Sequence, residues 1–170
     1  LKKSRPIKVT ENMLQEGIDQ LSVLYNQGQF SAAVEKAEVL TKQYPEAFIF
    51  WNILGASAAK IDLLDKAIDA FNKAILLKPD SADAYNNIGN VLKRQGKLDE
   101  AIDTYKRSIL LKPDYADSYY NMGNALQDKG KMEEAIDAYN KVLILNPDHA
   151  SAYNNMGNAL KDQFKLDEAI

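Results

Sequence analysis

Asparagine is concentrated in rows that could bind a polypeptide. An amide offers a hydrogen-bond donor and an acceptor without charge, so amides at a fixed spacing could hold an extended peptide backbone largely independently of its side chains. Asparagine costs a helix roughly 0.5–0.7 kcal/mol relative to alanine, which predicts an offsetting role in peptide contact or in bonds between adjacent helices. The rows consist of Asn52, Asn86, Asn87, Asn90, Asn121, Asn124, Asn154, Asn155 and Asn158.

Catalytic chemistry finds little support. His149 is the only histidine and has no second histidine for zinc. Gly89 and Gly96 are too far apart for the two glycines of a phosphate loop, and Leu98 occupies the position where that loop needs Ser or Thr. The acidic pairs Asp99–Glu100, Glu133–Glu134 and Asp167–Glu168 fit the first turns of helices, where negative charge is favourable. We therefore expect no enzyme activity, cofactor or metal.

The asparagine rows belong to a repeat of 34 residues. Pro45, Pro79, Pro113 and Pro147 mark its period, which is typical of stacked helical repeats. Small and aromatic residues recur in columns that predict a core between closely packed helices. These columns are Trp51, Tyr85, Tyr119 and Tyr153; Gly55, Gly89, Gly123 and Gly157; Ala33, Ala67, Ala101, Ala135 and Ala169; and Ala37, Phe71, Tyr105 and Tyr139.

Each repeat reads as two helices joined by a short turn. Trp51, Leu54, Gly55 and Ala58 follow the i, i+3, i+4, i+7 spacing of one helix face. A second helix carries Ala67, Phe71 and Ala74 at similar spacing, and the proline closes the repeat. The turns are marked by Gly28, Gly96 and Gly130, and the expected caps of the following helices are Asp80, Asp114 and Asp148.

The pattern resembles the tetratricopeptide repeat family. Its signature is carried by Trp51, Leu54, Gly55, Ala67, Phe71, Ala74 and Pro79, and it recurs in the next two repeats. The resemblance implies an all-α fold, a right-handed superhelical solenoid of antiparallel helix pairs with a concave groove. In this family the groove is lined by the face of each first helix that here carries the asparagines.

The asparagine-lined repeats are also similar to those of O-linked N-acetylglucosamine transferase. That resemblance implies that Asn87, Asn121 and Asn155 are the rungs of a peptide-binding ladder. Asn90, Asn124 and Asn158 would lie beside the rungs, and Tyr120 would add an aromatic edge. A carboxylate clamp for chaperone tails is not expected, because the groove positions that would hold its basic residues contain no lysine.

The repeats divide the chain into an array and a short leader. We expect a basic linker over 1–10, with Lys2, Lys3, Arg5 and Lys8, and an array over 11–170. The units span about 14–47, 48–81, 82–115, 116–149 and 150–170, and the first is atypical. Asp62 and Phe164 replace the turn glycine in the second and fifth units, which leaves the geometry of those two turns open.

The last unit stops a few residues into its expected second helix, and the chain does not begin with methionine. These features suggest a fragment of a longer protein. An apolar surface near Tyr153, Met156, Leu160 and Leu166 would then remain uncovered, and we expect it to pair with another copy.

Composition limits the partners. The net charge is −3 with no basic stripe along the repeats, so nucleic-acid binding is disfavoured. No apolar run is long enough to span a bilayer, and we expect no membrane partner. The absence of cysteine excludes disulfides and is compatible with a reducing compartment, so we expect a cytoplasmic protein.

The sequence thus predicts a scaffold for protein–protein interactions that binds an extended peptide or partner segment in its concave groove. One alternative is a substrate-recruiting arm of a larger, glycosyltransferase-like enzyme whose catalytic domain lies beyond residue 170. Another is a structural module that associates with itself to form a homo-oligomer.

Overall fold

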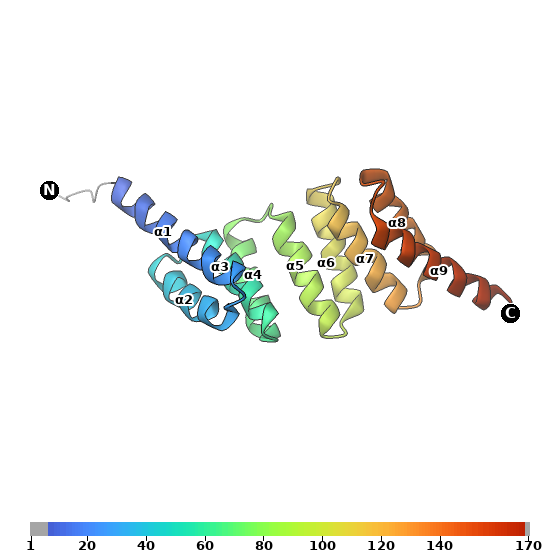
Figure 1. The fold of residues 1–170 in the computed structure, drawn as a ribbon, viewed down its shortest axis with the longest axis horizontal. Helices are drawn as coiled ribbons and strands as arrows, with labels where there is room; N and C mark the ends of the chain where they lie inside the picture. Colours follow the sequence, from blue (N-terminus) through green and yellow to red (C-terminus); the bar gives the residue numbers. More distant parts are fainter. Residues whose placement is uncertain (1–6, 169–170) are drawn as a thin grey trace. The chain divides into compact units, whose positions relative to one another are not determined.

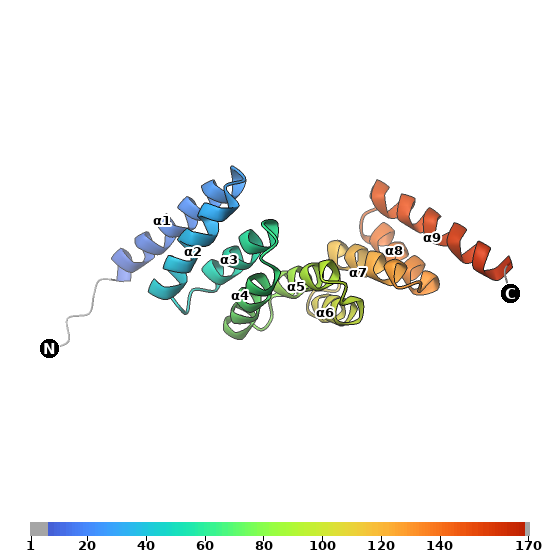
Figure 2. The same cartoon turned by 90° about the horizontal axis from the view of Figure 1, so that it is seen from below.

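The fold is built from antiparallel helices. The computed structural model describes the backbone of residues 7–168 and the side chains of residues 12–164. Within that range all regular structure is helical, as the 3.6-residue periodicity predicted. The helices are α1 (Ile7–Asn26), α2 (Phe30–Gln43), α3 (Phe48–Lys60), α4 (Leu64–Leu77), α5 (Ala82–Arg94), α6 (Leu98–Leu111), α7 (Ala116–Asp128), α8 (Met132–Leu145) and α9 (Ala150–Glu168) (Figures 1 and 2).

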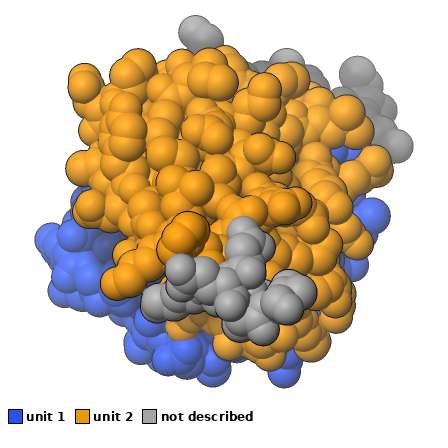
Figure 3. Space-filling model, turned by 90° about the vertical axis from the view of Figure 1, so that its right-hand side faces the viewer, with its two compact units in different colours: residues 1–79 blue, residues 80–170 orange. Residues whose placement is uncertain are grey.

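The chain divides into two compact units, residues 1–79 and residues 80–170 (Figure 3). In the first unit, each of α1 to α4 packs on its neighbour in the chain, and α1 also contacts α3. In the second unit, α5 to α9 pack in the same order, with α5 against α7 and α7 against α9. Each unit therefore stacks the first helix of one repeat on the first helix of the next, which confirms an all-α helical-repeat solenoid.

The glycine column exists because an aromatic ring from the second helix lies on it. A Cβ atom added at Gly55 would come 2.8 Å from the ring of Phe71, and one at Gly123 would come 2.6 Å from the ring of Tyr139. Gly89 meets Tyr105 in the same way. The three rings are almost fully buried, so they have little room to retreat. The predicted core is thus present at these glycines, at Phe71, Tyr105 and Tyr139, and in the described part of the alanine column, whereas Trp51, Tyr85 and Tyr119 of the other aromatic column are only half-buried and Tyr153 is exposed.

The first repeat fills the same space with the sizes exchanged. Leu21 occupies the glycine position and Ala37 the aromatic position, and both are fully buried. A large residue on the first helix thus accompanies a small residue on the second, which conserves volume in the core. The backbone of residues 7–10 is already helical, although the sequence suggested a linker up to residue 10. Residues 1–6 lie outside the described range.

The turns depend on a left-handed residue. Gly28, Gly96 and Gly130 have φ of 72°, 75° and 80°, which glycine adopts without strain. Asp62 adopts φ of 61° at the matching place in the second repeat, since a short polar side chain tolerates this conformation better than most. The second repeat therefore turns as the others do, even without its glycine.

The fifth repeat does not turn within the described residues. We expected a turn near Phe164, but α9 runs from Ala150 to Glu168 without interruption. A bulky residue at this position disfavours the left-handed conformation that the other turns use. Tyr153 remains 52% exposed, Leu160 48% and Phe164 63%, whereas Met156 is half-buried. The predicted patch is thus exposed at Tyr153 and Leu160, and the side chain of Leu166 lies outside the described residues.

The expected aspartate caps are wrong by one residue. Helix α5 begins after Ser81, whose hydroxyl accepts a hydrogen bond from the backbone N–H of Ala84 at 3.3 Å. Helix α7 begins after Tyr115, which makes no side-chain cap. His149 precedes α9, and its Nδ1 accepts from the backbone N–H of Ala152 at 3.1 Å. The single histidine therefore has a structural role as a cap.

None of the helices in the described range combines the length and the apolar character needed to cross a bilayer.

Candidate peptide-binding groove

The candidate groove residues come from the first helices of successive repeats. Asn52 lies on α3 in the first unit, and the other asparagines lie on α5, α7 and α9 in the second unit. Stacking brings α5 against α7 and α7 against α9, so amides from neighbouring repeats can meet. The structure shows which of them do.

Asn86 lies inside the stack. Asn86 is only 5% exposed. Its Oδ1 accepts a hydrogen bond from Nδ2 of Asn121 at 3.1 Å and another from Oγ of Ser118 at 3.2 Å. The sequence placed Asn86 on the groove, but its amide carbonyl instead joins α5 to α7. A buried polar group with partners of this kind specifies how the two helices pair.

A buried serine pair extends this junction. Oγ of Ser118 lies 2.7 Å from Oγ of Ser108, which donates to the backbone carbonyl of Ala82 at 2.8 Å. The two hydroxyls have two protons for three contacts, counting the contact with Asn86, so one contact is unmade at any moment. We did not predict this cluster.

A signal for the serine pair was present in the columns. At the position of Ser118 the other repeats have Glu16, Phe50, Ala84 and Ala152, and at the position of Ser108 they have Leu40, Ala74 and Val142. Serine in two columns that are mostly apolar indicates a local polar contact. The two columns meet only after the helices stack, so the partner of each serine was not visible in the sequence.

The junction between α7 and α9 is bonded through different atoms. Nδ2 of Asn155 donates to Oδ1 of Asn124 at 2.8 Å and to the hydroxyl of Tyr120 at 3.1 Å. The hydroxyl of Tyr139 lies 2.8 Å from Oδ1 of Asn124 and 2.9 Å from Oε1 of Gln127. The carbonyl of Asn124 thus accepts from the next repeat, and it shares the single proton of the Tyr139 hydroxyl with Gln127.

The aromatic residues of the second helices orient the asparagines. The hydroxyl of Tyr105 donates to Oδ1 of Asn90 at 2.7 Å, just as Tyr139 does to Asn124. Burial raises the pKa of Tyr139 to about 12 and raises the pKa of Tyr105 further, so both phenols stay protonated at neutral pH. The sequence assigned these rings to the core, which is correct, but it missed the role of their hydroxyls.

Three candidate asparagines of the second unit make no side-chain hydrogen bond to the described residues. Asn87 on α5 is half-buried, and Asn154 and Asn158 on α9 are exposed. Tyr120, the predicted aromatic edge, is half-buried, and its ring centroid lies 4.9 Å from that of His149. No described side chain therefore occupies the amide of Asn87.

The first unit offers one amide with an unsatisfied acceptor. Oδ1 of Asn52 is buried and has no hydrogen-bond partner among the described residues. The residue lines a pocket of about 230 Å³ between α1 and α3, together with Ser22, Tyr25, Asn26, Ile53 and Ala56. An acceptor of this kind costs free energy unless a ligand or water donates to it.

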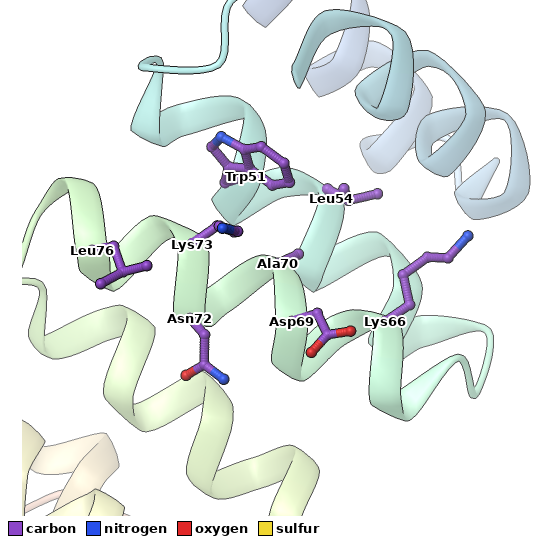
Figure 4. A pocket seen from close by; sticks show the side chains of 8 residues that line it. All are labelled: Trp51, Leu54, Lys66, Asp69, Ala70, Asn72, Lys73 and Leu76. Atoms are coloured by element: carbon purple, nitrogen blue, oxygen red, sulfur yellow. The ribbon is translucent and has the colours of Figure 1, made fainter. Parts of the chain in front are cut away.

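A second hollow of about 460 Å³ in the first unit is lined by none of the candidate asparagines (Figure 4). Helix α3 contributes Trp51 and Leu54, and α4 contributes Lys66, Asp69, Ala70, Asn72, Lys73 and Leu76. Nε1 of Trp51 is occupied by the backbone carbonyl of Pro45 at 2.8 Å, and Nζ of Lys66 by Oε1 of Glu38 at 2.5 Å. Two of its polar groups are therefore already bonded.

Several charged side chains of the second unit form ion pairs. Nζ of Lys93 lies 2.9 Å from Oδ2 of Asp128, and Lys129 forms an ion pair with Asp99. The hydrogen bond from Lys129 holds the pKa of Asp99 below its usual range. Among the described residues no cluster of His, Asp and Glu could hold a metal ion.

Family comparisons agree with the repeat architecture. A model described as TPR repeat matches residues 64–96 and 92–130. Two models described as tetratricopeptide repeat match residues 116–149 and 149–170. Together these matches span more than half of the chain. A comparison with curated proteins finds no match.

Solved structures agree as well. In the crystal structure of MamA, the MamA sequence is 30% identical to this chain. The match covers 88% of this chain and 87% of the MamA chain, with a TM-score of 0.79. The first TPR of Spaghetti (RPAP3), bound to the HSP90 peptide SRMEEVD, is 24% identical to this chain. The match covers 67% of this chain and 90% of the other, with a TM-score of 0.66. TTC0263, a thermophilic TPR protein in Thermus thermophilus, is 18% identical to this chain. The match covers 82% of this chain and 77% of TTC0263, with a TM-score of 0.73. The chain belongs to the tetratricopeptide repeat family.

Proposed function

We propose that the chain is a non-enzymatic interaction module that holds an extended peptide or partner segment against the first helices of its repeats. The observation that carries this proposal is the row of amides on α5, α7 and α9 with polar atoms that no described residue occupies. Asn87, Asn121 and Asn155 are its rungs. Asn90, Asn124 and Asn158 lie beside them on the same helices.

The structural neighbours support a peptide as the class of ligand, since the first TPR of Spaghetti was solved with a bound peptide. The ligand of this chain differs in chemistry, because its groove positions contain no lysine that could grip a C-terminal carboxylate. Neutral amides instead suit the polar groups of a main chain. The module therefore captures an internal, extended segment.

A random twelve-residue phage-displayed peptide library tests the proposal, with the affinity of a selected peptide measured by titration calorimetry. Asn87→Ala is the cleanest variant, because Asn87 bonds to no described side chain. We expect Asn87→Ala to weaken binding about tenfold, which corresponds to ~1.4 kcal/mol, with the melting temperature unchanged. Asn140→Ala, an exposed asparagine on α8, is the matched control. Equal affinity of both variants and the wild type would remove Asn87 from the site.

Self-association is a second candidate, supported by the exposed apolar side chains on α9. Tyr153, Leu160 and Phe164 together leave a stripe that the described residues do not cover. Light scattering during size-exclusion chromatography over a concentration series tests it. A dimer that Leu160→Asp converts to monomer would support self-association, and a monomer at every concentration would exclude it.

A further inference from the structure

The hollow shown in Figure 4, here called the Trp51 hollow, combines an aromatic wall with an apolar interior. It is lined by Leu54 and Ala70, which are only 5% and 2% exposed, and by the half-buried ring of Trp51. The hydrogen bond from Nε1 of Trp51 to the carbonyl of Pro45 holds the indole in place. The volume of the hollow, about 460 Å³, is typical of ligand sites, which measure about 300–1,000 Å³. A large apolar side chain of a partner can therefore enter it.

Charged groups of α4 surround this apolar surface. Lys66 is already paired with Glu38. Neither Lys73 nor Asp69 forms an ion pair with a described residue. Figure 4 shows Lys73 extending toward Trp51, while the carboxylate of Asp69 points away from that ring. A carboxylate that entered the hollow beside the indole would therefore lie close to an unpaired ammonium group, which favours an acidic partner.

The equivalent positions in the next two repeats carry different chemistry. Tyrosine takes the place of Trp51, and glutamate takes the place of Lys66. The tyrosines are Tyr85 and Tyr119, and the glutamates are Glu100 and Glu134. A glutamate at this position would repel an acidic segment, since like charges brought together at an interface suppress the wrong partner. Of these three repeats, only the second therefore suits an acidic segment.

Trp51 and Asn52 are consecutive on α3, so their side chains leave the helix about 100° apart. The hollow and the candidate groove therefore use different faces of α3. We propose that the Trp51 hollow binds a second kind of partner, a protein segment that places an aromatic side chain against the indole and an adjacent carboxylate against Nζ of Lys73. Aromatic pairs attract beyond the area that they bury, and tryptophan is enriched among the residues that dominate interfaces. This site does not depend on the groove amides.

The chemistry of the partner is tested by clearing the peptide library on Lys73→Glu, which removes binders of other surfaces, and then selecting on the wild type. We expect the selected peptides to share an aromatic residue beside Asp or Glu and to bind Lys73→Glu at least tenfold more weakly. Replacing that acidic residue of the peptide by lysine should restore binding to Lys73→Glu. Lys141→Glu, the exposed equivalent on α8, is the matched control and should bind as the wild type does. Peptides without the aromatic–acidic pair, or no peptides, would overturn the proposal.

The place of binding is tested by fluorescence, because Trp51 is the only tryptophan of the chain. A selected peptide, with phenylalanine in place of any tryptophan of its own, should change the Trp51 emission over the same concentrations at which calorimetry detects binding. Asn87→Ala should leave this titration unchanged. Unchanged emission at saturation would overturn the hollow as the site. A tenfold loss in Asn87→Ala would instead place the peptide in the groove, so that this inference fails while the proposed function stands.

Discussion

Helices α7 and α9 begin with similar sequences and have different surroundings. Residues 116–132 and 150–166 share the motif N-M-G-N-A-L at matching positions. Helix α7 ends at Asp128, and the chain turns at Gly130 so that α8 packs on α7. Helix α9 instead continues to Glu168. The ring of Tyr139 lies on Gly123, while a Cβ atom added at Gly157 would meet nothing within 4 Å. The same glycine is a packing requirement in one helix and a plain weak helix former in the other.

The comparison teaches that the motif on a first helix acquires its function only from the second helix. Tyr139 fills the space above Gly123 and also bonds to Asn124, so one side chain takes part both in the packing and in the contacts of a candidate groove amide. Nothing described does this for Gly157 or Asn158. We therefore expect matched substitutions in the two helices to have unequal effects.

The largest contrast should come from removing the aromatic ring. Tyr139→Ala empties a fully buried site and should lower the free energy of unfolding by about 3–5 kcal/mol. Tyr153→Ala removes a half-exposed ring and should cost less than about 1 kcal/mol. Urea denaturation followed by circular dichroism measures both. Comparable losses would show that α9 is also packed in solution.

The glycines should differ in the sign of their effect. Gly123→Ala forces the buried ring of Tyr139 to move and should destabilise by about 1–3 kcal/mol. Gly157→Ala meets open space and should stabilise α9 by up to about 1 kcal/mol through helix propensity. Thermal melts of the two variants at equal concentration distinguish these cases. A destabilised Gly157→Ala would mean that another element covers this face of α9.

Alkaline pH should lower the stability of the repeat that contains Tyr139. Burial raises the pKa of Tyr139 to about 12, from the usual value near 10 in the unfolded chain. The folded protein therefore holds this proton more tightly, so its contribution to stability is complete below pH 10 and is lost as the pH rises toward 12. Tyr139→Phe should cost about 1 kcal/mol at pH 7 and reduce the decline above pH 10. Identical slopes for variant and wild type, from urea titrations at pH 9 to 11, would contradict the assignment.

The smallest effect should come from the missing turn glycine. Phe164→Gly supplies the residue that the turns at Gly96 and Gly130 use, and it costs a continuous helix about 1 kcal/mol. We expect faster amide hydrogen exchange at residues 165–168, with the exchange of α7 unchanged. Phe164→Ala should retain the slow exchange because alanine favours the helix. Equal rates in the two variants would show that Phe164 does not decide whether the helix continues.

The sequence alone determined the repeat, its helices and much of the core. A 34-residue period, apolar spacing along each helix and three turn glycines are properties of neighbouring residues, and the hydrogen bonds of a helix are local. The columns likewise marked Gly89, Tyr105, Gly123 and Tyr139 as core positions, although which ring lies on which glycine appeared only in the structure. Even the replacement of glycine by Asp62 left its turn intact, because one residue with positive φ is all that the turn requires.

Only the tertiary structure decided how the asparagines are used. Whether Asn86 faces solvent or Asn121, and whether Asn124 presents its oxygen or its nitrogen, depends on partners some 30 residues away in the chain. The serine pair at Ser108 and Ser118 and the unbroken course of α9 were likewise missed. An amide looks the same from either end in the sequence, and its orientation is set by the free energy of pairing every buried donor with an acceptor across a helix interface.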